Sequence, residues 1–313
     1  MEMRRIGQLD VSVVGVGCNN FGWTIDYDKA SQVVDAALDA GINFFDTADI
    51  YGKRQSEEFL SRALGNRRHR AVIATKFGMD VDGSLKSGRP EYARQAAEDS
   101  LRRLGTDHID LYYIHRPDPN VPIADTLGAL NDLVSAGKVR EIACSNFTAD
   151  MLAAANDAAR GRGRFVAVQN QYNLLHRDPE RDVLPACERL HIAFVPYFPL
   201  ASGLLSGKYR RGQPAPEGSR IAAVGHFAGM LSDQNLGVVE SLRSFAESKG
   251  HSLLELAMSW LLARPAVASV IAGATSPQQV VANAVAAGWR LTDVDMAVVD
   301  AIVPSAGPVA SAR

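Results

Sequence analysis

The chain has 313 residues, 47% of them hydrophobic, a formal charge of -2 at pH 7 and a sequence pI of about 6.4. This content supports a sizeable core, and the charge provides no global positive field for nucleic acid or an anionic membrane. Cys18, Cys144 and Cys187 lie far apart without metal-type spacing, so we expect reduced thiols and no metal. No stretch reaches the about 18 apolar residues of a membrane span, and the N-terminus lacks an apolar signal segment. We expect a soluble, cytoplasmic protein.

The chain begins with a predicted β-hairpin that turns at Gly7–Gln8, and a buried strand follows at Val13–Gly17. Strands and helices then alternate, and several helices end at a glycine. The further strands are expected at Ile42–Phe45, Ala71–Thr75, Ile109–Ile114, Val139–Cys144, Val166–Gln169, Ile192–Pro196 and Val267–Ala272. The helices that follow the strands are expected at Asp28–Ala40, Ser56–Leu64, Pro90–Leu104, Ile123–Ala136, Ala149–Ala159, Pro179–Leu190, Ser252–Leu262 and Pro277–Ala287.

Eight strand–helix units favour a (β/α)8 barrel over a doubly wound sheet, the other fold that such alternation allows. The strands are apolar on both faces, as parallel strands covered by helices should be. Three segments fall outside the repeat: a long loop at Gly207–Gly229 and two extra helices at Ser232–Ser248 and Asp293–Ile302. We therefore predict one domain over residues 1–313, a TIM barrel with an N-terminal β-hairpin and extra C-terminal helices.

Polar side chains follow three consecutive strands. FFDTADIYG carries Asp46 and Tyr51, VIATKFG carries Lys76, and HIDLYYIHRPDP carries His115. The C-terminal strand ends of such a barrel meet at one rim, where active sites lie. Each residue alone has a structural explanation, as a turn former, a solvent-facing lysine or a packed aromatic side chain. The set of four at successive strand ends predicts a shared site.

These four residues suit proton transfer. A phenol has a pKa near 10, and a nearby ammonium such as Lys76 lowers that value. Asp46 can keep Lys76 charged and oriented, and His115 can donate to a substrate oxygen. General acid catalysis of this kind contributes about 10²–10⁴-fold. We interpret Tyr51 as the proton donor, and we expect the neighbouring Asp49 to be a solvated loop carboxylate.

The motifs DTADIYG, ATKFG and IHRPDP resemble the catalytic tetrad of the aldo-keto reductase family, and the resemblance covers nearly the whole chain. It implies a (β/α)8 barrel, a nicotinamide cofactor and the reversible reduction of an aldehyde or ketone to an alcohol. Hydride would come from the nicotinamide C4 and the proton from Tyr51. The resemblance also implies that Ser145, Asn146 and Gln169 contact the nicotinamide carboxamide and that Tyr197, which alone could equally be core, stacks on the ring.

The same resemblance implies contacts with the rest of the cofactor. The predicted pyrophosphate contacts are Leu200, Ser202, Gly203, Leu205 and Lys208, and those of the adenosine end are Gly273, Thr275, Gln279 and Asn283. The second group adjoins Ser276–Pro277, which also reads as an ordinary capped helix start. The resemblance implies NADPH, but Gln279 stands where an arginine that grips the 2′-phosphate is common, so NADH is also possible.

The pocket mouth has three candidate residues, Trp23, Phe77 and Arg116, although the two aromatic residues could equally be rim packing. We expect a small-molecule carbonyl substrate as the partner, no nucleic acid or membrane, and a monomer or simple homo-oligomer. Two alternatives stay open. One is a nucleotide-sensing subunit like the potassium-channel β subunits, and the other is a barrel lyase or aldolase that uses Lys76 as a Schiff-base nucleophile.

Overall fold

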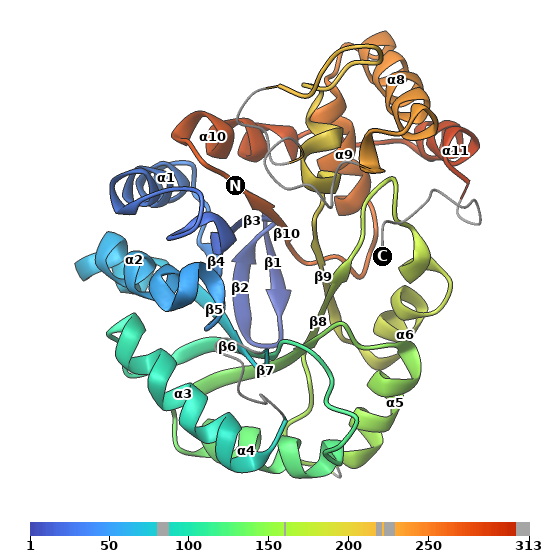
Figure 1. The fold of residues 1–313 in the computed structure, drawn as a ribbon. Helices are drawn as coiled ribbons and strands as arrows, with labels where there is room; N and C mark the ends of the chain where they lie inside the picture. The colour runs from blue at the N-terminus through green and yellow to red at the C-terminus, as the bar shows by residue number, and fades with distance from the viewer. Residues whose placement is uncertain (80–87, 160, 217–220, 222–228, 305–313) are drawn as a thin grey trace.

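Eight parallel strands form the centre of the fold, in the order β10-β3-β4-β5-β6-β7-β8-β9 (Figure 1). The computed structural model describes residues 1–79, 88–159, 161–216, 221 and 229–304. The strands are β3 (Val14–Gly17), β4 (Phe44–Asp46), β5 (Val72–Phe77), β6 (Ile109–Ile114), β7 (Val139–Ser145), β8 (Ala167–Gln171), β9 (Ala193–Tyr197) and β10 (Val270–Gly273). The predicted (β/α)8 barrel is therefore confirmed.

The sheet closes on itself where β9 meets the segment that leads into β10. The Phe194 amide donates to the carbonyl of Ala266 at 2.7 Å, and the Ala268 amide donates to the carbonyl of Phe194 at 3.0 Å. Phe194 and Val267 also form a parallel bridge. The two edge strands are thus joined, which removes the open edges that a flat sheet would expose.

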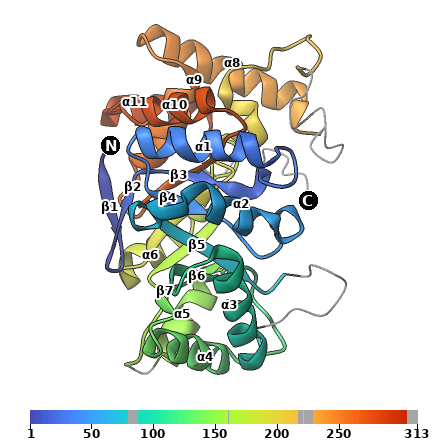
Figure 2. The same cartoon turned by 90° about the vertical axis from the view of Figure 1, so that its left-hand side faces the viewer.

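Helices cover the outside of the barrel (Figures 1 and 2). They are α1 (Tyr27–Asp39), α2 (Gln55–Leu64), α3 (Pro90–Leu104), α4 (Ile123–Ser135), α5 (Ala149–Ala158), α6 (Val183–Leu190), α8 (Asp233–Ser248), α9 (Leu253–Leu262), α10 (Pro277–Ala286) and α11 (Asp293–Ile302). The sequence placed α3, β6 and α11 at the bounds observed. The helix predicted from Pro179 instead begins at Val183, after a 3₁₀ helix at Asp178–Glu180, because Asp182 has non-helical backbone angles.

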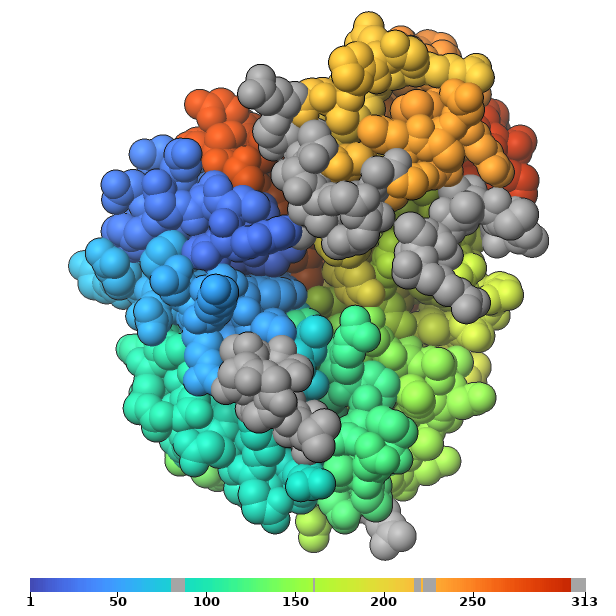
Figure 3. All heavy atoms as spheres, viewed as in Figure 1, coloured from blue at the N-terminus to red at the C-terminus, as the bar shows by residue number. Residues whose placement is uncertain are grey.

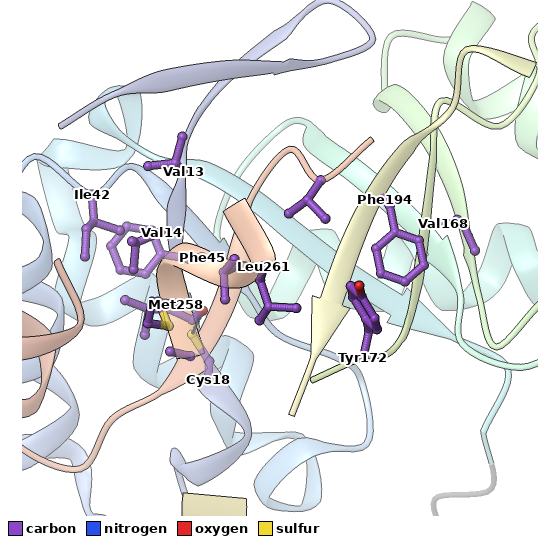
Figure 4. Packing of buried hydrophobic residues seen from close by; sticks show 14 of the residues in the cluster. Val13, Val14, Cys18, Ile42, Phe45, Val168, Tyr172, Phe194, Met258 and Leu261 are labelled. Atoms are coloured by element: carbon purple, nitrogen blue, oxygen red, sulfur yellow. Dashed lines mark hydrogen bonds between the residues drawn. The ribbon is translucent and has the colours of Figure 1, made fainter. Parts of the chain in front are cut away.

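Alternate residues of each strand supply two cores, as the two-residue period of a strand requires. Phe45, Val168 and Phe194 face the helices and pack in the larger core, part of which is shown in Figure 4. Phe44 and Tyr113 point into the barrel interior and belong to a separate, smaller core. The strands are buried on both faces, so their positions are fixed from two sides.

The N-terminal hairpin closes one end of the barrel. Its strands β1 (Met3–Ile6) and β2 (Leu9–Ser12) pair antiparallel, as predicted, and lie at the left end of the barrel in Figure 2. Ile6, Leu9 and Val11 are buried in the interior core. The opposite rim, formed by the C-terminal strand ends, faces the viewer in Figure 3. Parts of the predicted loop at 207–229, namely 217–220 and 222–228, lie outside the described residues.

The α9 residue Trp260 leads to a prediction about how strongly helix packing stabilises the fold. It is fully buried, and its ring centroid lies 5.1 Å from that of Tyr172. We expect Trp260→Ala to lower the free energy of unfolding by about 3–5 kcal/mol, because a large buried side chain is lost and the cavity refills only in part. Urea denaturation measures this change. Val294→Ala, at a residue that is 71% exposed, is the control and should change stability by less than about 0.5 kcal/mol.

Candidate active site

A buried ion pair lies at the C-terminal end of β4 and β5. Lys76 Nζ donates to Asp46 Oδ1 at 2.5 Å and to the carbonyl oxygen of Thr47 at 2.8 Å. Both charged side chains are almost fully buried, so each depends on the other for its solvation. Lys76 lies within β5 and not, as the sequence had predicted, after the strand. Its backbone is therefore held by the hydrogen bonds between neighbouring strands.

Tyr51 and His115 complete the cluster. The Lys76 ammonium nitrogen lies 5.1 Å from the centroid of the Tyr51 ring. The Tyr51 and His115 rings meet edge to face, with centroids 5.8 Å apart. Tyr51 begins a 3₁₀ helix (η2, Tyr51–Arg54), where Gly52 has φ of 55° and a Cβ would collide with the carbonyl oxygen of Phe21. Only glycine fits there, so the turn that presents Tyr51 is built into the sequence.

Burial and Lys76 act in opposite directions on the phenol. Burial raises the pKa of Tyr51, the Lys76 ammonium lowers it, and the pKa stays above its ordinary value of 10. We predicted the effect of Lys76 from the sequence, but not that desolvation would outweigh it. Tyr51 therefore keeps its proton at neutral pH.

His115 and Lys76 also have defined protonation states. Burial and the nearby Lys76 and Arg116 charges hold the pKa of His115 well below its usual range, so the imidazole is neutral at pH 7. Burial alone would lower the pKa of Lys76, but the attraction of Asp46 raises it above its ordinary value. A neutral imidazole has one N–H to donate, and a charged lysine stabilises a developing phenolate. The cluster can thus give a proton and stabilise the charge left behind.

Four of the residues predicted to contact the cofactor lie beside this cluster. Tyr197 OH donates to Asn146 Oδ1 at 2.9 Å, and Asn146 Nδ2 donates to the carbonyl oxygen of His115 at 2.9 Å. Ser145 Oγ donates to the carbonyl oxygen of Gln169 at 2.7 Å. These hydrogen bonds connect the ends of β6, β7, β8 and β9 into one polar network.

Gln169 has a contact that the sequence did not indicate. Its Nε2 donates to Asp46 Oδ2 at 2.8 Å, so the second oxygen of the carboxylate is also satisfied. This bond lowers the pKa of Asp46, against the rise caused by burial. Gln169 therefore positions Asp46, in addition to any role at a cofactor. Spacing in the sequence carries no signal for a bond between residues 123 positions apart.

The loop after β9 has an unusual backbone. Phe198, Ala201 and Ser202 adopt positive φ angles, and so does Gly203 at 98°. A Cβ on Gly203 would lie 3.3 Å from Lys208 Cε and Nζ, so glycine leaves room for that side chain. Strained backbone of this kind clusters at ligand sites. The other two residues predicted here differ from each other, since Leu205 is fully buried, whereas Leu200 is partly buried.

The predicted adenosine contacts lie around the start of α10. The Thr275 amide and hydroxyl donate to Gln279 Oε1 at 2.9 and 3.3 Å. Ser276 caps the helix, as predicted. Gly273 and Gln279 are exposed, and Asn283, one turn further along, is buried. The structure therefore places these residues around one helix N-terminus, where backbone N–H groups favour anions.

Two sequence expectations near the rim are wrong. Phe77 is fully buried and stacks on Tyr112 with centroids 4.8 Å apart, so it belongs to the core and does not line a pocket mouth. Asp49 is 5% exposed and not a solvated carboxylate. Both follow from the β5 pleat and the turn after β4, which direct these side chains toward α3. Trp23 is 52% exposed and Arg116 is exposed, as rim residues would be.

The described part of the chain contains neither a cluster suited to a metal ion nor a helix suited to a membrane. No group of three or more His, Cys, Asp or Glu side chains there could hold a metal ion. None of the helices in those residues is long and apolar enough to cross a membrane. Cys18, Cys144 and Cys187 are free and buried.

A TIM barrel with an Asp, Tyr, Lys and His cluster on its rim defines a class of oxidoreductase. The aldo/keto reductase family model matches residues 13–304. A probable aldo-keto reductase of Glycine max is 35% identical over 97% of this chain and 88% of its own. A probable voltage-gated potassium channel subunit beta of Oryza sativa is 33% identical over 90% of each chain. A glycerol dehydrogenase structure from Gluconobacter oxydans aligns with a TM-score of 0.84 and 32% identity, over 96% of this chain and 94% of that one.

The chain belongs to the aldo-keto reductase family. This is a family of oxidoreductases that generally use NAD(P)H and act on small carbonyl compounds. The structural comparison covers nearly the whole of both chains, so the two proteins share the same fold.

The ion pair leads to a prediction about stability. Lys76→Met should lower the free energy of unfolding by about 3–5 kcal/mol at pH 8, because it leaves the Asp46 carboxylate buried without its cation. The deficit should shrink as the pH falls, since Asp46 in the variant has a raised pKa and takes up a proton. Urea denaturation between pH 5 and 8 measures this. An equal deficit at both ends of that range would contradict it. The double variant Lys76→Met, Asp46→Asn should show no such pH dependence.

Proposed function

We propose that the protein reversibly reduces an aldehyde or ketone to an alcohol with NADPH, in the cytoplasm, as one domain over residues 1–313. The observation that carries the proposal is the buried Lys76–Asp46 pair beside Tyr51 and His115 on the active rim. Family membership supports the reaction class, and the chemistry of these four groups supports the assignment of their roles.

Tyr51 is the acid in this proposal. Its raised pKa keeps the proton in place until a carbonyl oxygen gains negative charge, and the proton then passes from the phenol oxygen to that oxygen. The adjacent Lys76 ammonium stabilises the resulting phenolate, and Asp46 keeps Lys76 in position. His115, as a neutral imidazole, donates a hydrogen bond that orients the carbonyl oxygen. In the reverse reaction the phenolate accepts the alcohol proton.

The cofactor proposal rests on the polar groups that flank the cluster. When bound, a dihydronicotinamide cofactor supplies the hydride. Asn146 and Gln169 carry the amide groups, and Ser145 the hydroxyl, that could hold its carboxamide. The Tyr197 ring joins the same network through its hydrogen bond to Asn146. Lys208, exposed beside Gly203, offers a cation for the pyrophosphate.

NADPH preference follows from the family resemblance. Thr275 and the exposed start of α10 provide a polar site for a 2′-phosphate. Gln279 is neutral where a cation would add affinity, so we propose that NADH is also accepted. The substrate is a small carbonyl compound, and the rim residues Trp23 and Arg116 form part of its entrance.

The Schiff-base alternative is disfavoured by the state of Lys76. A lysine nucleophile must lose its proton, but the pKa of Lys76 is raised by Asp46 and its nitrogen already donates to two oxygens. The Oryza sativa relative is named as a potassium channel subunit, so a nucleotide-sensing role stays the second candidate function. A sensing subunit would bind NADPH without sustained turnover of a carbonyl substrate.

The first test of the function is Tyr51→Phe. We expect kcat for reduction of 4-nitrobenzaldehyde with NADPH to fall by about 10²–10⁴-fold, because the acid is lost. NADPH affinity, followed by cofactor fluorescence, should be unchanged within about twofold. Tyr27→Phe is the matched control, since Tyr27 packs against Phe59 and Arg62 away from the cluster. Near wild-type turnover by Tyr51→Phe would remove Tyr51 as the acid, and absence of NADPH binding by the wild type would remove the reductase function.

A second test concerns the adenosine end. Gln279→Arg should lower the Kd for NADPH by roughly tenfold, because a charge-assisted hydrogen bond to a phosphate contributes about 1.5–3 kcal/mol. The Kd for NADH should change by less than about twofold, since NADH lacks that phosphate. Fluorescence titration with each cofactor measures the ratio. Equal changes in the Kd for NADPH and the Kd for NADH would place the 2′-phosphate elsewhere. Gln278→Arg, one residue earlier on α10, provides a charge-matched control.

A further inference from the structure

Asp49 occupies an unusual position behind the active rim. It lies between Asp46 and Tyr51 in the chain, and its amide donates to the carbonyl oxygen of Lys76 at 3.1 Å. Its side chain is 5% exposed, and Oδ1 has no hydrogen-bond partner in the described residues. The Tyr92 hydroxyl on α3 lies 3.5 Å from Oδ2, a long hydrogen bond at best. A carboxylate in such surroundings is poorly solvated.

A second carboxylate lies close to Asp49. Glu57, on α2, is fully buried and accepts hydrogen bonds from Thr75 Oγ1 and Arg103 Nε, both at 2.6 Å. Thr75 precedes Lys76 on β5, so the two neighbours point to opposite faces of the strand. Thr75 binds this outer network, and Lys76 binds Asp46. The outer network and the proposed active site thus share one strand and the turn after β4.

The charged groups around Asp49 do not fully compensate a negative charge on its carboxylate. Repulsion from Glu57 disfavours its ionised form, while Arg103 and Arg54 favour that form. The Arg103 guanidinium is already bound to Glu57. Two phenols complete the surroundings, Tyr92 on α3 and the buried Tyr112 on β6.

We propose that Asp49 is a positioning residue for Tyr51 and that it holds the segment 46–51 in place as a neutral carboxylic acid. This inference rests on the proposed reductase function. Neutral Asp49 can stay in its buried position beside the Tyr92 hydroxyl. Ionised Asp49 is repelled by Glu57 and drawn toward water. Its amide is bonded to the Lys76 carbonyl and Tyr51 lies two residues later, so movement of Asp49 displaces both groups.

The titration of Asp49 agrees with this geometry. Burial, and then Glu57, raise its pKa from 3.8 to about 7, with Arg103 and Arg54 opposing the rise. Because the folded-state pKa is raised, stability from the neutral form is present at low pH and is lost as the pH rises toward and through about 7. The neutral acid is therefore well populated at neutral pH and largely absent at pH 8.5.

The decisive variant is Asp49→Asn, which keeps the shape of the neutral acid and cannot ionise. We expect kcat of the wild type for 4-nitrobenzaldehyde, with saturating NADPH, to fall roughly tenfold between pH 6 and 8.5, since small displacements of catalytic groups cost that much or more. Asp49→Asn should hold kcat nearly constant over the same range. Asp157→Asn, an exposed carboxylate on α5, is the matched control and should follow the wild type.

Stability provides an independent readout. The unfolding constant of the wild type, relative to that of Asp49→Asn, should rise by roughly tenfold per pH unit between about pH 5 and 7. Should Asp49→Asn fail to fold, ¹³C NMR titration of aspartate carboxyl groups in the wild type replaces it, with a midpoint near 7 expected for Asp49. Superimposable kcat profiles for wild type and Asp49→Asn, or a carboxyl midpoint near 4, overturn the inference alone. A wild type that binds NADPH but turns over no carbonyl substrate at any pH overturns the proposed function as well.

Discussion

The ion pair between Lys76 and Asp46 is the interaction on which the candidate active site depends. Two opposite charges buried at the ends of adjacent strands cannot be separated without leaving one of them unsolvated. Gln169 and the Thr47 carbonyl complete their hydrogen bonding, so β4, β5 and β8 are held in one register at this point. The pair costs desolvation energy, and the barrel provides the packing that keeps it in place. As a result, the Lys76 ammonium is held 5.1 Å from the centroid of the Tyr51 ring.

Much of the fold followed from the sequence because its signals are local. Eight apolar runs that alternate with helical patterns predict a barrel, and glycines, prolines and caps place the helix ends. Lys76, Asp46, Tyr51 and His115 were found because each ends a strand or lies in the loop that follows one, and such strand ends meet on one rim. The hairpin followed from the turn at Gly7–Gln8.

The residues that were misplaced depend on tertiary contacts. Phe77 follows Lys76, and nothing in the local sequence states that it lies under α3 and stacks on Tyr112. Asp49 has the composition of a loop residue, yet α2 and α3 cover it. The bond from Gln169 to Asp46 spans the barrel. The net direction of the Tyr51 pKa depended on how completely the phenol is desolvated, which no spacing in the sequence reveals.

The N-terminal hairpin closes one end of the barrel, which limits the routes by which small molecules can reach the candidate site. Ile6, Leu9 and Val11 fill the interior from the N-terminal side, so that side provides no route for water. In the proposed reductase, substrate and product would therefore cross the opposite rim, at the C-terminal strand ends. Anything that narrows that rim slows the arrival of substrate and the departure of product together. In the proposed reductase, the described part of that rim would therefore influence both selectivity and turnover.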